Sequence, residues 1–324
     1  MCKTLTGYAP AAGYLAARLA DMAQHHPSMP HYTLKEYSPL LDSSSLQPQL
    51  WNEIVGDIAL NYPNYDGFVV IHGTDTLVYT ASALSFMLSN LGKPVIITGS
   101  MIPLVETPND AEQNLLDALS WACQENLYEV CVAFNRELLR GNRARKIASA
   151  DFAAFCSPNY PVLGHIKSTP QLNSALCLPP PKKDFYAYRI NAELAIAGIK
   201  LFPGYTYRVI EQWLFKQKLA AVVLETYGSG NAPENDTALL AAFKYAHRQG
   251  TIIVNCSQCL SGKVSMGDYT ASHALLNLGL ISAYDMTSEA ALSKLYVLLS
   301  QSSLDLIHVA EKLSLAWCGE ITVQ

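Results

Sequence analysis

The chain has 324 residues, of which half are apolar and 15% are charged, a composition typical of a globular protein and not of a disordered one. Its net charge of -5 argues against a nucleic-acid partner, which would require a basic face. The sequence has no run of about 18 uninterrupted apolar residues, so we expect neither a membrane span nor a membrane partner.

The amino terminus and the cysteines indicate a cytoplasmic protein. The first residues, MCKTLTGYAP, lack the charged segment and apolar core of a secretory signal. Eight thinly spread cysteines are typical of reduced thiols and not of a disulfide framework. Cys256 and Cys259 form a CxxC, but no second ligand pair lies at a suitable spacing. We expect two buried thiols at a strand end and no metal.

Apolar, β-branched runs alternate with helical patterns along the chain. We expect strands at 65–73, 94–100, 129–135, 219–226 and 251–258, and helices at 77–91, 108–124 and 235–249. Continuous apolar runs of this kind are typical of strands buried on both faces. The alternation predicts an α/β fold of mostly parallel sheets flanked by helices.

The domain boundary is visible as a change in composition. Residues 168–191 lose the periodicity and include the run PPPKK, which is typical of a linker or surface loop. We therefore expect a larger N-terminal α/β domain at 1–167, a linker at 168–191, and a smaller C-terminal α/β domain at 192–324.

A polar pentapeptide, His72 to Thr76, follows the first strand and opens the next helix. Ligands of open α/β sheets bind at such strand ends. Hydroxyls beside the Asp75 carboxylate can position a water or activate a nucleophile. In the alternative interpretation, Thr76 caps the helix and Asp75 complements its dipole. The pentapeptide alone favours capping over catalysis, and both interpretations stay open.

A second polar cluster, RGNRARK at 140–146, follows the strand at 129–135. Four cations in seven residues are commonly a solvated loop. If Lys146 instead turns toward Asp75, the two form a triad with Thr74. Burial would lower the pKa of Lys146 and Asp75 would raise it, so the lysine is either a base or an electrostatic anchor.

Two further stretches contain helix-start signals. The run Asp42-Ser43-Ser44-Ser45 is most simply a cap for a helix that begins near Pro48, although a carboxylate and hydroxyls also fit a ligand that carries an ammonium and a carboxylate. The run TPND at 107–110 predicts a capped helix start with proline at the first helical position.

Together these clusters resemble the bacterial L-asparaginases, specifically the cytoplasmic type I enzymes. The matching elements run in family order over nearly the whole chain: GYAP (7–10), LLDSSS (40–45), YDGFVVIHGTDTLVYTASALSFML (65–88), GKPVIITGSMIP (92–103), RGNRARK (140–146), YGSGNAPEN (227–235), NCSQCLSGKVSMGDY (255–269) and DMTSEAALSKL (285–295).

The resemblance implies hydrolysis of the side-chain amide of L-asparagine to L-aspartate and ammonia, without metal or cofactor. Thr74, Asp75 and Lys146 match the family's Thr-Asp-Lys triad. Tyr8 matches a tyrosine on a flexible loop that closes over the substrate.

The resemblance also implies substrate-binding residues and an oligomer. The segment that holds the amino-acid end of the substrate is matched by Asp42, Ser43 and Ser44. Asn231 and Glu289 match polar positions that approach the site from a neighbouring subunit of the family's tetramers. A homodimer or homotetramer is therefore expected.

One family motif is not found. The family's nucleophilic threonine lies in a TGGTIGM motif after its first strand, and Met1 falls at the position of that motif's methionine. Either a start codon was placed at an internal methionine, which we favour, or catalysis was lost. We expect weak or no asparagine hydrolysis by the 324-residue chain and full activity from an upstream-extended chain. Full turnover by the 324-residue chain would refute this expectation, and the genomic sequence before the Met1 codon checks it independently.

Regulation by asparagine at a second site is expected to be weakened or lost. Ser257 and Cys259 match the effector-site hydroxyl and cysteine of the family, but Glu225 stands where regulated enzymes have an arginine. An arginine clamps a carboxylate with two hydrogen bonds, whereas a glutamate repels it.

Two rival functions stay open. The glutamine amidase subunit of a tRNA-dependent amidotransferase shares this catalytic core, but no basic region or extra N-terminal domain is visible. A non-catalytic amino-acid sensor would bind aspartate without releasing ammonia.

Overall fold

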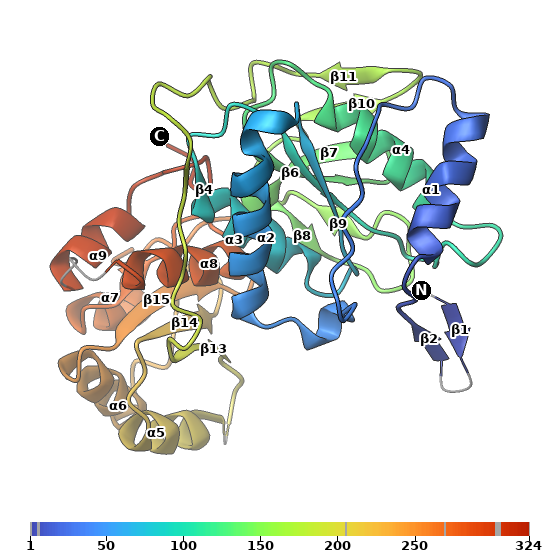
Figure 1. Cartoon of the computed structure of the whole chain (residues 1–324). Coiled ribbons are helices and arrows are strands. Elements are labelled where there is room, and N and C mark those ends of the chain that lie inside the picture. Colours follow the sequence, from blue (N-terminus) through green and yellow to red (C-terminus); the bar gives the residue numbers. More distant parts are fainter. Residues whose placement is uncertain (1, 5–6, 205, 269, 302–305, 324) are drawn as a thin grey trace. The chain divides into compact units, whose positions relative to one another are not determined.

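The computed structural model describes residues 2–4, 7–204, 206–268, 270–301 and 306–323 (Figure 1). The chain forms two compact units, one of residues 1–157 with 161–187 and the other of 158–160 with 188–324. The division at residue 187 lies inside the expected linker, and the part of that segment before it contributes two short strands to the first unit.

The first unit contains a six-stranded mixed sheet. Its order is β11 (Pro170–Leu172), β10 (Gly164–Ile166), β7 (Glu137–Arg140), β6 (Val130–Phe134), β5 (Val95–Thr98) and β3 (Phe68–Ile71). The pairs β3–β5 and β5–β6 are parallel, and the other pairs are antiparallel. Together with the parallel sheet of the second unit, this confirms the expected two-domain α/β fold class.

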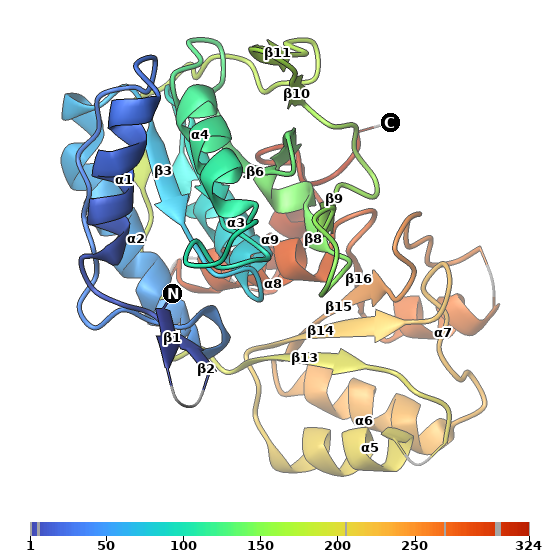
Figure 2. The same cartoon turned by 90° about the vertical axis from the view of Figure 1, so that its right-hand side faces the viewer.

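Helices cover both faces of the central strands. Every residue of β5 and β6 is buried, and successive strand residues point to opposite faces, so both faces are covered. Figure 2 shows α4 (Ala111–Ala122) lying across these strands. The helix α3 (Leu77–Met87) is buried along all but one of its residues, because the sheet, α2 (Pro48–Asn61) and the 3-10 turn at Gly141–Arg143 surround it.

Strand β3 differs from the predicted strand buried on both faces. It is the last strand of the sheet in the described part of the chain, and its residues are partly exposed. Ile71, at its carboxyl end, is 43% exposed. The apolar run predicts a central strand. An edge strand has a neighbouring strand on one side alone, however, so β3 is less buried than the run predicts.

Several predicted boundaries need correction. The run at 107–110 does not start a helix with Pro108, because α4 begins at Ala111 and the Asn109 side chain accepts from the Ala111 and Glu112 N–H groups. The helix predicted at 77–91 ends at Met87, and the two-residue strand β4 (Leu88–Ser89) then pairs with β12 (Tyr186–Ala187).

The cationic cluster at 140–146 is not a solvated loop. Arg140 donates to Glu129 over 2.6 Å, and both side chains are 3% exposed. Arg140 also donates to the Leu176 carbonyl, and Glu129 accepts from the Leu178 N–H. Arg143 is buried as well. Because a buried cation requires a partner, this cluster fixes the chain that leads to Lys146.

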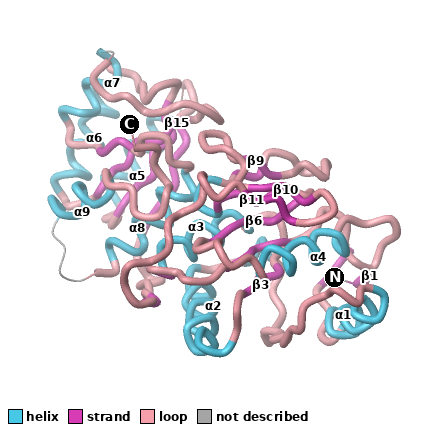
Figure 3. The backbone as a smooth tube through the Cα atoms, turned by 90° about the horizontal axis from the view of Figure 1, so that it is seen from above, coloured by secondary structure: helices cyan, strands magenta, loops and turns pink. Residues whose placement is uncertain are grey.

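The second unit contains a four-stranded parallel sheet, which Figure 3 distinguishes by colour from the helices around it. Its order is β13 (Ile196–Lys200), β14 (Ala221–Thr226), β15 (Ile252–Ser257) and β16 (Ile281–Ser282). The helices α5 (Thr206–Lys216), α6 (Thr237–Arg248) and α7 (Thr270–Asn277) contribute to one core cluster with these strands, and α8 (Ser288–Leu299) also packs on the sheet.

A buried ion pair fixes the carboxyl-terminal segment to the second unit. Lys294 of α8 donates to Glu320 over 2.7 Å, and both side chains are fully buried. Lys294 also donates to the carbonyls of Leu313 and Leu315 and lies over the Trp317 ring. Burial lowers the pKa of Lys294, and the Glu320 carboxylate opposes this change. Lys294 therefore holds the start of the segment after α9 (Leu306–Leu313), and Asp285 accepts hydrogen bonds from Thr322 further along it.

Short elements complete the first unit. They are the hairpin β1 (Cys2–Thr4) with β2 (Gly7–Ala9), α1 (Tyr14–His25), the 3-10 turns Ser43–Ser45 and Tyr62–Asn64, and the pair β8 (Arg145–Lys146) with β9 (Phe155–Cys156). In the part of the chain that is described, no helix combines the length and apolarity that a membrane crossing requires.

Candidate active site

Three polar side chains from distant parts of the sequence meet at one end of the first sheet. The Lys146 ammonium donates to Thr74 Oγ1 over 2.9 Å and to Asp75 Oδ1 over 2.7 Å. The Lys146 side chain is 19% exposed, whereas that of Asp75 is 63% exposed. A mostly covered cation therefore joins the hydroxyl of a partly buried threonine to a carboxylate that is exposed to solvent.

The turn between β3 and α3 positions two of these groups. Thr74 and Asp75 lie where β3 has ended and α3 has not begun. The prediction that Thr76 caps α3 is wrong, because its hydroxyl donates to the Ser43 carbonyl over 2.7 Å and makes no capping hydrogen bond. The first N–H groups of α3 are therefore left without this cap, as an anion-binding helix start requires.

Lys146 reaches this turn from a short hairpin. Residues Arg145 and Lys146 form β8, which pairs with β9. The turn before them packs on α3, where Gly141 lies against Ala81 and Ser85 so closely that a Cβ would be 3.2 Å from the Ala81 carbonyl oxygen. A glycine at this contact allows the backbone to approach α3, which brings Lys146 toward the α3 start.

The serine-rich segment lies against the same turn. Asp42 does not cap the helix at Pro48, because its carboxylate accepts from the Ser44 N–H and hydroxyl and so caps the 3-10 turn Ser43–Ser45. These bonds lower the pKa of Asp42, the hydroxyl of Ser44 being the larger cause. A Cβ added to Gly73 would be 2.4 Å from Ser43 Oγ. Asp42 and Ser44 are exposed, and Ser43 is partly buried and lies against the turn that holds Thr74 and Asp75.

His72 is a site residue that sequence reasoning missed. Its Nδ1 lies 2.7 Å from the Gly73 carbonyl, which can accept but not donate, so Nδ1 carries the proton. Its Nε2 then accepts from the Thr80 hydroxyl over 2.9 Å, and Trp51 donates to Thr80 over 3.2 Å. Burial lowers the pKa of His72, which favours this neutral form. These hydrogen bonds orient the peptide that precedes Thr74. No local sequence pattern predicts them, because Trp51, His72 and Thr80 are separated in sequence.

Asp110 and Asn114 were also missed, and they fix the loops that follow β5 and β6. The Asp110 carboxylate accepts from the N–H groups of Met101 and Ile102, each over 2.9 Å. The buried Asn114 amide donates to the Gly99 carbonyl and accepts from the Asn135 N–H. Asp110 falls in the run at 107–110, which the sequence indicates as a helix start, and Asn114 falls in the helix predicted at 108–124.

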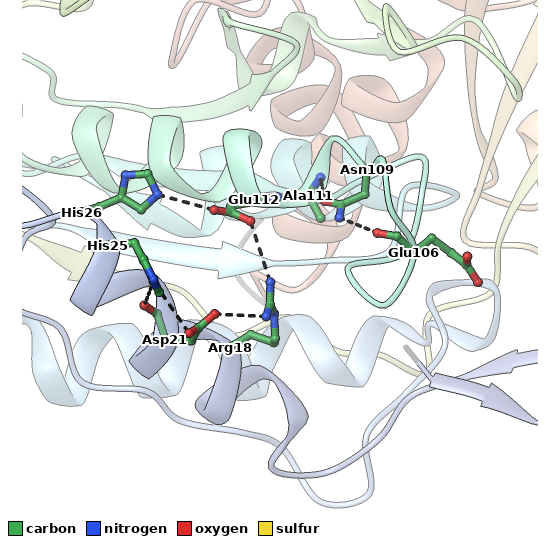
Figure 4. A network of polar contacts seen from close by, with 8 residues as sticks. All are labelled: Arg18, Asp21, His25, His26, Glu106, Asn109, Ala111 and Glu112. Atoms are coloured by element: carbon green, nitrogen blue, oxygen red, sulfur yellow. Dashed lines mark hydrogen bonds and ion pairs between the residues drawn. The ribbon is translucent and has the colours of Figure 1, made fainter.

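Tyr8 lies on β2 and is fastened to the loop before α4. Its hydroxyl donates to Glu106 over 2.6 Å, and the ring is 43% exposed. Figure 4 shows a contact of the helix that follows, α1, with α4, in which Arg18 and His26 point toward Glu112. Glu106 thus anchors Tyr8, and Glu112 anchors α1.

Asn231 and Glu289 belong to the second unit. The backbone of Asn231 pairs with that of Tyr227, and its side-chain oxygen is buried without a hydrogen bond. Glu289 is buried in the first turn of α8, where the Ser288 hydroxyl donates to it over 3.3 Å.

The three residues matched to an effector site lie at the carboxyl ends of β14 and β15. Glu225 is on β14 beside Cys256, and Ser257 ends β15. Ser257 donates to the Gly228 carbonyl and accepts from the Cys259 N–H. The expectation of two buried thiols holds for Cys256 but is wrong for Cys259, which is exposed. Within the described ranges, no three histidine, cysteine, aspartate or glutamate side chains are grouped as a metal site would need.

Comparisons with known proteins cover both units. The description "Asparaginase, N-terminal" matches residues 4–176, and "Glutaminase/Asparaginase C-terminal domain" matches residues 195–310. The L-asparaginase 1 of Escherichia coli (strain K12) is 44% identical over 327 residues, which covers 99% of this chain and 94% of that protein.

A solved structure and a more distant relative extend this result. The L-asparaginase I structure from Vibrio cholerae superposes with a TM-score of 0.87 at 46% identity, covering 97% of this chain and 94% of that one. A Glutamyl-tRNA(Gln) amidotransferase subunit from Methanobrevibacter smithii is 32% identical, over 93% of this chain and 70% of that protein.

Proposed function

The chain belongs to the asparaginase family, and we propose that its site hydrolyses L-asparagine to L-aspartate and ammonia through Thr74, Asp75 and Lys146. The observation that carries the proposal is the Lys146 ammonium, which donates at once to the Thr74 hydroxyl and the Asp75 carboxylate. A positioned hydroxyl, a proton donor and a counter-charge are what amide hydrolysis requires.

Each group has a role in the proposed reaction. An amide is a poor electrophile, so its carbonyl carbon must meet an activated oxygen nucleophile, and its nitrogen must be protonated before it leaves. In the overall reaction an oxygen from water bonds to the carbonyl carbon, its proton passes through Thr74 and Lys146 to the amide nitrogen, and the C–N bond breaks so that ammonia leaves. Asp75 keeps the lysine in place. The uncapped start of α3 offers N–H donors to the oxyanion that develops on the carbonyl oxygen.

The Asp42 turn is proposed to hold the amino-acid end of the substrate. The carboxylate of Asp42 pairs with the α-ammonium, while Ser43 and Ser44 face the polar groups beside it. Fixing both charged ends of asparagine places its side-chain amide at Thr74. Tyr8 covers the bound substrate.

The spacing between these two turns is predicted to be critical. Gly73→Ala inserts a Cβ that would lie 2.4 Å from Ser43 Oγ, so the turns must separate. We expect kcat/KM for asparagine, measured in an upstream-extended chain, to fall roughly 100-fold, since small misplacements of reacting groups are costly. Gly56→Ala is the matched control, because a Cβ there meets open space and should leave catalysis unchanged. Unaltered kcat/KM in Gly73→Ala would contradict this role.

The pH dependence of substrate binding is predicted to depend on Ser44. Its hydroxyl is the main cause of the lowered pKa of Asp42, so Ser44→Ala raises that pKa. Because the ammonium is bound by the ionised carboxylate, affinity is lost as pH falls through the pKa of Asp42. The acid-side rise in KM should therefore start at higher pH in Ser44→Ala than in the parent, with Ser45→Ala as the control. An identical KM profile in both variants would exclude Asp42 as the ammonium partner.

An ammonia-release assay separates this function from its rivals. Purified protein is given L-asparagine or L-glutamine, as the 324-residue chain and as an upstream-extended chain. Release from asparagine supports the proposal, and release from glutamine alone supports the amidase subunit of an amidotransferase. Calorimetry that detects aspartate binding with no ammonia from either form would support the sensor.

We further propose the remaining properties that the family resemblance implies. The protein acts in the cytoplasm on a small molecule as a homodimer or homotetramer, in which Asn231 and Glu289 approach the site of a neighbouring subunit. Glu225 stands where regulated relatives have an arginine, so asparagine activation is weakened. Light scattering tests the oligomer, and a sigmoidal rate curve that is lost in Cys259→Ala would count against weakened activation.

A further inference from the structure

The outer sides of α5 and α6 carry an unusual exposed surface in the second unit. Arg208, Gln212 and Phe215 are spaced by four and three residues along α5, and all are exposed. On α6, Tyr245 and Arg248 are three residues apart and both are exposed. The residues on the opposite sides of both helices pack in the core of the second unit, so the exposed residues on these outward sides are not part of that core.

The two stripes form one continuous surface. The rings of Phe215 and Tyr245 are in contact, with centroids 4.9 Å apart, although they are 45% and 39% exposed. Val209, six residues before Phe215 on the same helix, is 54% exposed. We call this surface the α5–α6 face and define it by its exposed residues Arg208, Val209, Phe215, Lys216, Lys218, Lys244, Tyr245 and Arg248. Figures 1 and 2 show the two helices side by side.

The charge of the α5–α6 face is opposite to that of the whole chain. Residues 206–218 and 237–249 contain five lysines and arginines and one glutamate, a net charge of +4, in a chain whose total is -5. The glutamate, Glu211, is paired with Arg208 over 3.1 Å. Cations in a last helical turn complement the helix dipole, which accounts for Lys216 and Arg248. The dipole does not account for Lys218 and Lys244 or for the exposed rings.

The sign of this charge selects the kind of partner. A symmetric contact between two copies would bring two faces of +4 together, which is repulsive. A partner must instead be anionic and must also accept two aromatic rings and an aliphatic side chain. Three of the five cations are lysines. A lysine acts as a point charge, so it suits a diffuse anionic surface better than a single carboxylate or phosphate bound in a bidentate manner.

We propose that the α5–α6 face binds the surface of a membrane that contains anionic phospholipids. The lysines and arginines meet the headgroup phosphates, and Phe215 and Tyr245 reach the boundary between headgroups and acyl chains. The sequence expectation of no membrane partner rested on the lack of a spanning segment, and surface binding does not need one.

Vesicle sedimentation tests the proposal directly. The intact protein is mixed at low salt with vesicles of phosphatidylcholine alone or of phosphatidylcholine with phosphatidylglycerol. We expect pelleting with the anionic vesicles, no pelleting with the neutral ones, and release of the protein as salt screens the contact. Failure to pellet with the anionic vesicles at low salt overturns the proposal, and asparaginase activity is not part of the readout.

Charge reversal at matched sites assigns the contact to this face. Lys244→Glu with Arg248→Glu should weaken binding roughly tenfold or more. Phe215→Ser with Tyr245→Ser should weaken it several-fold. Lys182→Glu with Lys183→Glu changes the net charge equally at exposed residues of the first unit and should leave binding intact. Equal loss in this control overturns the proposal, as does binding of polyglutamate in place of vesicles or a changed oligomeric state in the Lys244 and Arg248 variant.

Discussion

Replacing Lys146 by methionine is expected to lower kcat for asparagine about 1,000-fold, with a much smaller change in KM. Methionine keeps the length and apolar stem of the side chain but removes the ammonium that bonds to Thr74 and Asp75. Proton transfer by a positioned side chain contributes roughly 100-fold to 10,000-fold, and that contribution is lost with the ammonium. The effect on kcat follows because the interaction strengthens as charge develops on the substrate.

The control for Lys146→Met is a lysine that pairs with a carboxylate outside the site. Lys35 pairs with Asp57 and is 61% exposed, so Lys35→Met should leave kcat unchanged. Both variants are measured in the 324-residue chain and in an upstream-extended chain, so that a slow parent does not hide the effect. If Lys146→Met retains kcat within about threefold of its parent, Lys146 has no role in proton transfer.

Replacing Lys294 by methionine is expected to destabilise the second unit by about 3–5 kcal/mol, because the change leaves the Glu320 carboxylate buried without its counter-charge. The carbonyls of Leu313 and Leu315 also lose their donor. Urea unfolding followed by tryptophan fluorescence gives the free energy of unfolding.

Two further variants separate charge from packing in this pair. Lys294→Met with Glu320→Gln removes both charges while an amide oxygen can still accept from the Trp317 N–H, so most of the stability should return. The exposed Lys244→Met should change the free energy of unfolding by less than about 0.5 kcal/mol. A loss below about 1 kcal/mol in Lys294→Met alone would mean that the pair contributes little to stability.

The elements that the sequence predicts well are those with strong local patterns. The runs at 94–100, 129–135, 219–226 and 251–258 are strands because their apolar, β-branched residues suit a buried pleated sheet, and each observed strand falls within its predicted run. The two-domain α/β class follows from the alternation of such runs with helical patterns. These are statements about neighbours in sequence, which is why pattern and propensity suffice for them.

The predictions that failed concern polar side chains whose partners are distant in sequence. A threonine before a helix is usually a cap, but Thr76 has the Ser43 carbonyl within reach and bonds to it instead. Arg140 and Arg143 belong to a cationic run that is typical of a solvated loop, yet both are buried, and Arg140 pairs with Glu129. His72 bonds to Thr80, which in turn accepts from Trp51, and no local spacing predicts that chain.

The candidate site was predicted from the family resemblance together with strand-end geometry. The structure brings Thr74, Asp75 and Lys146 together, although 71 residues separate Asp75 from Lys146. Taken alone, the pentapeptide at 72–76 favoured a structural turn, and the cationic run favoured a solvated loop. Their meeting depends on the buried contacts of Arg140 and Gly141, which no local pattern predicts.

The most direct measurement is a crystal structure of the protein with L-aspartate, the expected product, paired with calorimetry of the same mixture. We expect the side-chain carboxylate of aspartate within hydrogen-bond reach of Thr74 Oγ1, its α-ammonium on Asp42, and a binding isotherm that Lys146→Met weakens. Aspartate bound elsewhere, or an isotherm that is the same in both proteins, would contradict the assignment of the amide-hydrolysing site to these residues.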